Sequence, residues 1–422
     1  MNKELELSGE SVAFKEKGTE VILALQHLIA MFGATVLVPI LTGFNPSVAL
    51  FTAGVGTLIF HFVTGGVVPV FLGSSFAFIA VINQVKVTHG GDLAYAQGGI
   101  LVAGLAYILV SFLVKKFKYE TIKKLLPSYV IGPMIIVIGF TSIPTALGMA
   151  SENYILAGIT LGTALLINIF AKGITKKMSI LIAIIVGYGS ALITNSVDLS
   201  IITGAGFLEM PAFTLPKFSI NAILTITPIV LAVFMEHVGD ITTNGEVVGK
   251  DFIKEPGLDR TLLGDGLATV FASLVGGPAN TTYGENTGVL AITKNYKPHI
   301  LRMAAVFAII LAFVGKLGGV LRSIPTPVMG GISLMLFSMI ALVGFQTLGK
   351  AHKEKEMKVE FKTVLIIAVI LIIGFAPTFL PEQIASFLQI RITDTISLSG
   401  LSLAALSGII LNAIFSLLEK KK

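Results

Sequence analysis

The chain has 422 residues with no cysteine and no tryptophan, and only 13% of its residues are charged. The missing thiols exclude disulfide bridges and thiolate metal sites, and the histidines and acids show no metal-ligand spacing. No nucleophile–base constellation appears either, so we expect neither a cofactor nor an enzyme. Soluble chains carry about 25% charged residues, so most of this surface is expected to face lipid. The net charge of +6 then indicates cytoplasmic loops rather than nucleic acid binding.

Long apolar runs predict membrane-spanning helices, because roughly 20 apolar residues cross a bilayer core of about 30 Å. The polar first twenty residues show no cleavable signal. About fourteen spans are predicted, of which the third and tenth are short and interrupted by small polar residues. They lie near 22–42, 48–66, 70–86, 94–114, 125–145, 153–171, 178–196, 221–245, 261–278, 281–294, 299–320, 327–348, 362–379 and 398–418.

The distribution of basic residues supports this count. With both termini in the cytoplasm, 25 of the 30 lysines and arginines fall in cytoplasmic segments, and the other 5 lie outside. Such a bias is the positive-inside rule. An even number of spans is therefore predicted, in the cell (inner) membrane.

The chain also carries an internal repeat. The stretch "LALQHLIAMFGA" resembles "VFMEHVGDITTN" at an offset of 210, which also pairs Ser75 with Glu285. Farther on, "LPSYVIGPMI" resembles "IPTPVMGGIS" at an offset of 198. Seven spans per half is an odd number, so the second half must be inverted in the membrane. Inverted repeats with paired broken segments point to a transport site near the midplane.

The two broken spans, 70–86 and 281–294, contain "GSSF" and "TTYGEN". Their β-prone and small residues predict a short extended strand leading into a half-helix. Irregular backbone at membrane depth is tolerated where protein or a cavity covers it, and its free N–H groups can hold a polar substrate. The predicted fold is an all-α polytopic membrane protein, a 7+7 inverted repeat with short strands in spans 3 and 10.

Acidic side chains inside spans are the strongest candidates for a site. A charge at the bilayer centre costs at least about 2.5–3.5 kcal/mol, so Glu236 and Glu285 are interpreted as functional rather than as a structural pair. Asp240 follows Glu236 at i+4, on the same helix face. Proton handling and plain hydrogen bonding both stay open for Asp240.

Other polar and aromatic residues have weaker signals. His27 and His237 are interpreted first as interhelical hydrogen bonders. The remaining histidines look peripheral, namely His61, His89, His299 and His352. Asp265 is assigned to the edge of a charged cytoplasmic loop. Aromatics beside the breaks, Phe76, Phe78 and Tyr283, are either packing or a stacking surface for a flat ring.

Five motifs in order resemble the nucleobase–ascorbate transporter family, in its uracil permease branch. They are "QHLIAMFGATVLVP", "LGSSFAF", "EHVGD", "NTTYGENTGVLAITK" and "PVMGGISLMLF". The resemblance covers about residues 20 to 418 and implies a proton-coupled nucleobase symporter in which a core domain moves against a gate domain. It implies a cytoplasmic tail (1–20), a core formed by 21–118 and 221–320, and a gate formed by 119–197 and 325–418.

The resemblance also assigns residues. Glu236 and Glu285 resemble the two carboxylates that bind the ring, and the N–H groups of Phe76 and Gly284 would meet its carbonyl oxygens. The expected substrate-binding set is completed by Ser75, Tyr283, Ala34 and Phe337, and the proton-coupling set is Asp240, Glu236 and His27. The expected partners are uracil, protons, the lipid bilayer and, through the gate, a second copy of the chain.

The sequence departs from the uracil branch in two places: Asp240 stands where a His is common, and Phe337 where a Tyr is expected. The first departure leaves the proton carrier undecided. Xanthine or uric acid transport by the same architecture is the alternative. A small-anion carrier is disfavoured because the site offers carboxylates, and a passive channel would show non-saturable flux.

Overall fold

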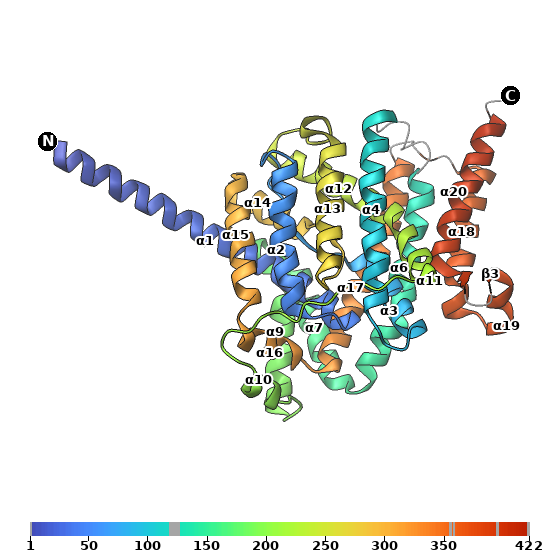
Figure 1. The fold of residues 1–422 in the computed structure, drawn as a ribbon, viewed down its shortest axis with the longest axis horizontal. Helices are drawn as coiled ribbons and strands as arrows, with labels where there is room; N and C mark the ends of the chain where they lie inside the picture. The colour runs from blue at the N-terminus through green and yellow to red at the C-terminus, as the bar shows by residue number, and fades with distance from the viewer. Residues whose placement is uncertain (1, 118–126, 354–356, 358, 394–395, 420–422) are drawn as a thin grey trace.

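The computed structural model describes residues 2–117, 127–353, 357, 359–393 and 396–419. Within these residues the chain is mostly helical, with two small antiparallel sheets of two strands each. The helices form one bundle, from which the N-terminal part of α1 projects at the end opposite the C-terminus (Figure 1).

The first half of the chain contains α1 (Asn2–Thr42), α2 (Pro46–Val63), β1 (Leu72–Ser74), the 3-10 turn η1 (Phe76–Phe78), α3 (Ile79–Thr88), α4 (Ala94–Phe117), α6 (Ser128–Ser151), α7 (Tyr154–Phe170), α8 (Gly173–Lys177), α9 (Ser179–Ile193) and α10 (Ser200–Gly204). The second half contains α11 (Ile220–Ile226), η2 (Thr227–Ile229), α12 (Val230–Val248), η3 (Ile253–Gly257), α13 (Leu258–Leu274), β2 (Asn280–Thr282), α14 (Gly284–Thr293), α15 (Pro298–Ala312), α16 (Gly315–Arg322), α17 (Thr326–Lys353), α18 (Phe361–Phe379), α19 (Glu382–Ala385), η4 (Ser386–Leu388), β3 (Ile390–Thr393), β4 (Ile396–Leu398) and α20 (Gly400–Glu419).

Eight helical stretches in the described residues are long and apolar enough to cross a membrane. They are Gly18–Thr42, Pro46–Val63, Ala94–Phe117, Ser128–Ser151, Ile220–Val248, Thr326–Lys353, Phe361–Phe379 and Gly400–Leu418. Shorter apolar helices of 10–17 residues are Phe76–Thr88, Tyr154–Phe170, Ser179–Ile193 and Pro298–Ala312. The chain is therefore a multi-pass membrane protein.

The prediction of one uninterrupted span over 299–320 is wrong. Helix α15 ends at Ala312, Val314 is extended, and α16 begins at Gly315. Gly315 donates its N–H to the Phe207 oxygen at 3.0 Å, and a Cβ on Gly315 would lie 2.5 Å from the Gly206 oxygen. The close approach of the 206–209 segment therefore replaces helical hydrogen bonds at this point.

Helix packing comes in matched sets. The contact between α2 and α15 corresponds to the contact between α13 and α4. The contact between α7 and α17 corresponds in the same way to the contact between α18 and α6. Likewise α7 packs on α9 as α18 packs on α20. Each pair becomes the other when elements of the first half are exchanged with those of the second, which is the pattern expected of a duplicated chain.

Strands β1 and β2 pair antiparallel at the centre of this arrangement, with Gly73 opposite Thr281. They start 208 residues apart, and the residues that precede the next helical segments, Ser75 and Tyr283, keep this offset. Two further hydrogen bonds obey it as well, from Ser75 N to Ala279 O (2.9 Å) and from Tyr283 N to Phe71 O (3.0 Å).

This register corrects the predicted pairing of Ser75 with Glu285. The counterpart of Ser75 is Tyr283, and the counterpart of Glu285 is Ala77. The offset of 210 came from motifs in α1 and α12, and the segments from these motifs to the strands, which include α2 and α13, differ in length by two residues. An offset measured in one part of a repeat therefore does not predict residue pairs beyond a segment whose length differs between the two halves.

Candidate functional site

Neighbouring helices hold the two strands in place through side-chain hydrogen bonds. Leu72 N donates to Thr57 Oγ1 on α2 at 2.9 Å, and Asn280 Nδ2 donates to the Thr52 oxygen at 2.9 Å. Thr269 on α13 donates to the Asn280 oxygen at 3.0 Å. These bonds satisfy backbone groups that lipid cannot, so an extended segment is stable at this depth.

Tyr283 fixes the geometry on one side of the strand pair. Its hydroxyl donates to the Ser74 oxygen at 2.9 Å and lies 3.4 Å from Thr35 Oγ1. The ring covers Gly73 so closely that a Cβ there would lie 2.3 Å from two of its carbons. Ala34 belongs to the same buried apolar cluster as Tyr283. A glycine is thus required at 73 for the aromatic ring to close over the strand.

The acids of α12 face the start of α14. Along α12, Glu236, Asp240 and Thr243 retain accessible surface, whereas His237 and its neighbour Val238 are buried. This spacing of four and three residues defines one helix face. The face carries two carboxylates, Glu236 and Asp240, one helical turn apart.

Contacts place this face beside the second break. Asp240 Oδ2 accepts a hydrogen bond from Thr282 Oγ1 at 3.3 Å, and a Cβ on Gly284 would lie 3.6 Å from Asp240 Oδ1. Glu285 follows in the first turn of α14, and the charges of Glu236, Asp240 and Glu285 interact with one another. The structure therefore brings all three predicted acids together.

Both breaks present the start of a helical segment. Phe76 opens η1 and is half-buried, while Gly284 opens α14 and is exposed. The first N–H groups of a helix lack intrahelical acceptors and carry partial positive charge. The buried Ser75 hydroxyl has no hydrogen-bond partner among the described residues. A polar molecule between the breaks would meet N–H donors from both halves and carboxylates from the second.

The buried histidines make interhelical hydrogen bonds, as interpreted. His27 accepts at its main-chain oxygen from Asn286 Nδ2 at 3.0 Å, and the same amide lies 3.2 Å from His27 Nδ1. His237 bridges Asp265 Oδ2 at 2.8 Å and Thr261 Oγ1 at 2.9 Å. Asn286 was missed by the sequence analysis, although its position directly after Glu285 in a span was the available signal.

Two assignments made from sequence are wrong. Asp265 is 1% exposed within α13, bonded to His237, and does not lie at the edge of a loop. His61 is 2% exposed, and its Nε2 lies 2.9 Å from the Val70 oxygen, so it is not peripheral. Asp265 is bonded to His237 on α12, and His61 to a main-chain oxygen nine residues farther on, and local composition reveals neither contact.

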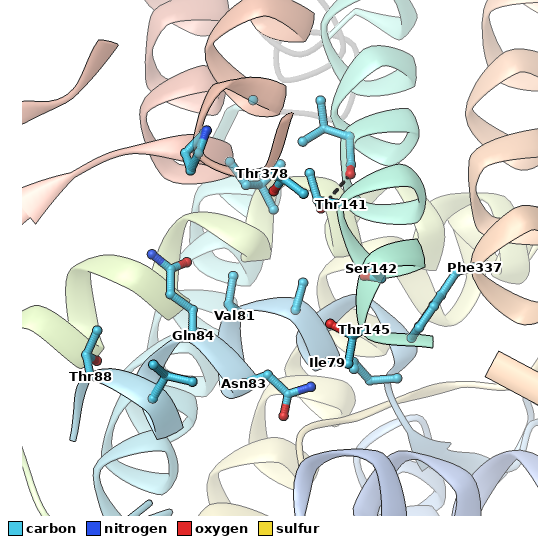
Figure 2. A pocket seen from close by; sticks show the side chains of 17 residues that line it. Ile79, Val81, Asn83, Gln84, Thr88, Thr141, Ser142, Thr145, Phe337 and Thr378 are labelled. Atoms are coloured by element: carbon cyan, nitrogen blue, oxygen red, sulfur yellow. Dashed lines mark hydrogen bonds between the residues drawn. The ribbon is translucent and has the colours of Figure 1, made fainter. Parts of the chain in front are cut away.

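Phe337 lies buried on α17 in the same apolar cluster as Ala34 and Tyr283, and Phe76 packs against that cluster. It also lines a cavity between α3 and α6 (Figure 2). Among the described residues, no group of three or more His, Cys, Asp or Glu side chains has the arrangement of a metal site.

The family model Xan_ur_permease, described as "Permease family", matches residues 18–383. The chain belongs to the nucleobase–ascorbate transporter family. Its members are transporters, so this transporter is not an enzyme. The uracil permease of Bacillus caldolyticus is 41% identical over 94% of this chain and 92% of its own length. A probable uracil permease of Haemophilus influenzae is 42% identical over 95% of both.

Solved structures share the fold of this transporter at low sequence identity. The transmembrane domain of the cyanobacterial bicarbonate transporter BicA aligns with a TM-score of 0.61 at 16% identity, covering 93% of this chain and 96% of that one. SLC26A9 aligns with a TM-score of 0.67 at 12% identity, covering 94% and 65%. At such identities only the fold is shared.

Proposed function

We propose that this transporter imports uracil by proton symport across the cell membrane. The observation that carries the proposal is the meeting of Glu236, Asp240 and Glu285 at the start of α14, beside two crossed strands. Relatives that are 41% and 42% identical over nearly the whole chain bear the name uracil permease.

Uracil alternates N–H donors with C=O acceptors around a flat neutral ring. The carboxylates of Glu236 and Glu285 accept from its N–H groups, and the backbone N–H groups of Phe76 and Gly284 donate to its carbonyl oxygens. Carboxylate–N–H hydrogen bonds are the stronger, charge-assisted kind. Tyr283 contacts a ring face, and the substrate-contacting set is completed by Ala34, Ser75 and Phe337.

Asp240 is the proposed proton carrier, with Glu236 and His27 as further participants. It lies one helical turn from Glu236 and accepts a hydrogen bond from Thr282. Protonation of Asp240 therefore changes a hydrogen bond to the second strand. Three clustered carboxylates in a membrane are costly, and binding one proton removes part of that cost. Proton uptake and substrate binding are thereby linked.

The matched packing of the two halves supports fourteen spans arranged as a 7+7 inverted repeat. The distribution of lysine and arginine supports cytoplasmic termini. In this arrangement the core (21–118 and 221–320) moves against the gate (119–197 and 325–418) around the acids. The gate also provides the contact between two copies of the transporter.

Uptake of radiolabelled uracil in permease-deficient cells, with and without a protonophore, tests the proposal. Uptake should depend on the proton gradient, and Glu236→Gln and Glu285→Gln should each reduce it to background at normal expression. Glu246→Gln, on an exposed turn of the same helix as Glu236, is the matched control and should transport normally. Uptake insensitive to the protonophore, or stronger competition by xanthine than by uracil, would contradict the proposal.

Asp240→Asn separates binding from coupling. The amide keeps an acceptor oxygen for Thr282, so uracil binding should be retained while accumulation driven by an imposed pH gradient is lost. Unchanged accumulation in this variant would assign Asp240 a purely structural hydrogen bond.

A further inference from the structure

A cavity of about 390 Å³ separates α3 from α6, α17, α18 and α20. Figure 2 shows Asn83 and Gln84 on α3 and Thr141, Ser142 and Thr145 along α6. Its lining residues contain seven amide or hydroxyl side chains and no Asp, Glu, Lys, Arg or His among the described residues. We name it the outer vestibule. Its volume lies in the range of small-molecule sites, about 300–1,000 Å³.

Several polar groups of the outer vestibule are available to a ligand. Thr141 and Ser142 donate back to helix oxygens at 2.7 and 2.8 Å, which leaves the hydroxyl oxygens free to accept. The side chains of Asn83, Gln84 and Thr145 make no hydrogen bond within the described part of the chain, and these residues retain accessible surface. Amides offer a donor and an acceptor side by side, which complements an N–H next to a C=O.

The outer vestibule is distinct from the acidic site. None of Glu236, Asp240, Glu285 or Gly284 lines it, whereas Phe337 and Ile79 form part of its wall. Phe337 is 1% exposed and belongs to the same apolar cluster as Tyr283. Phe337 therefore belongs both to the wall of the outer vestibule and to the apolar cluster that contains Tyr283.

We propose that the outer vestibule is a second docking subsite for a flat, neutral ring with adjacent N–H and C=O groups, and that Asn83 determines its specificity. This rests on the proposed function, because the topology of uracil import places the C-terminal ends of α3, α6 and α18 at the non-cytoplasmic face. The described lining of the subsite has no cationic side chain to balance the charge of an anion, which favours a neutral ring. We expect the ring to bind here before it moves on to the carboxylates.

Because the natural chain has no cysteine, single cysteines are clean probes of this space. Asn83→Cys and Thr145→Cys are treated in intact cells with a membrane-impermeant maleimide. Glu152→Cys, at an exposed position at the end of α6, is the control for labelling at the non-cytoplasmic face of the membrane. Lys250→Cys, also exposed, is the control for the cytoplasmic face. We expect the maleimide to label cysteines at 83, 145 and 152 but not at 250. Uracil should slow the labelling rate several-fold at 83 and 145 only.

The same labelling in a Glu285→Gln background separates the subsite from the acidic site. Protection of Thr145→Cys, which keeps Asn83, by millimolar uracil should persist there. Protection that disappears would overturn the proposal, because it then arises at the acids. In uptake assays Asn83→Leu should raise the apparent KM about three- to tenfold. Gln383→Leu, which replaces an exposed amide outside the outer vestibule, is the control. An unchanged KM in Asn83→Leu would also overturn the proposal. Absence of uracil uptake by the natural chain, or labelling at 250 instead of 152, would instead refute the proposed function or topology.

Discussion

The contact between Gly73 and Tyr283 permits a quantitative prediction for the strand crossing. A Cβ at Gly73 would lie 2.3 Å from Tyr283 Cε2 and Cζ and 2.6 Å from Thr35 Oγ1. The ring cannot simply swing away, because its hydroxyl is bonded to the Ser74 oxygen at 2.9 Å. Overpacking a closed site costs about 1–3 kcal/mol, and losing the Tyr283 hydrogen bond adds about 1 kcal/mol. Gly73→Ala should therefore lower the free energy of unfolding by roughly 2–4 kcal/mol.

Thermal unfolding of the purified transporter in detergent measures this effect. Gly284→Ala is the matched control, since its Cβ would meet only Asp240 Oδ1 at an ordinary 3.6 Å. The clash is tested further by a double-mutant cycle with Tyr283→Ala, which removes the ring. In that background Gly73→Ala should cost much less, giving an interaction energy of about 1–3 kcal/mol. A natural melting temperature for Gly73→Ala, or the same loss in both backgrounds, would refute the packing described.

Three further outcomes are expected. Asp265→Ala leaves buried His237 Nδ1 without its 2.8 Å partner and should destabilise the transporter by about 3–5 kcal/mol in thermal unfolding, and Asp265→Asn by less. Thr57→Val removes the hydroxyl that accepts from a β1 N–H and should cost about 1–3 kcal/mol by the same assay. The hydrogen bond from Lys217 lowers the pKa of Asp92, in the loop after α3. Its stabilisation is full above the ordinary value of 3.8 and is lost as pH falls through the folded-state pKa. Asp92→Asn should therefore melt below the natural chain near neutral pH and together with it in strong acid.

The acids and the broken spans could be predicted from sequence because each differs in composition from the apolar residues around it. A carboxylate such as Glu236 in an apolar span has a cost that composition alone reveals. Strand-forming residues between Gly and Pro also stand out locally, and the structure has β1 and β2 in these two segments. The irregular backbone and the charge at the candidate site were thus both local signals.

What the sequence did not reveal depends on contacts between separate elements of the fold. Asp265 looked like part of a charged loop, and only the position of His237 on the facing helix makes it a buried acceptor. His61 is fixed by an oxygen nine residues away across a turn. The interruption before Gly315 depends on the 206–209 segment, whose approach no periodicity encodes. Tertiary contact overrides helical propensity at that position.

The corrected register explains how two similar halves make one asymmetric site. The first N–H groups of Phe76 and Gly284 are equivalent under the offset of 208, so the backbone supplies donors from both halves. The side chains break this symmetry: the counterpart of Glu285 is Ala77, and the sequence match pairs Glu236 with Gln26. The uracil ring has no two-fold symmetry, so its two ends differ in where the N–H and C=O groups lie. A symmetric pair of donors therefore fits its carbonyls, while carboxylates confined to the second half fix which way round the ring is bound.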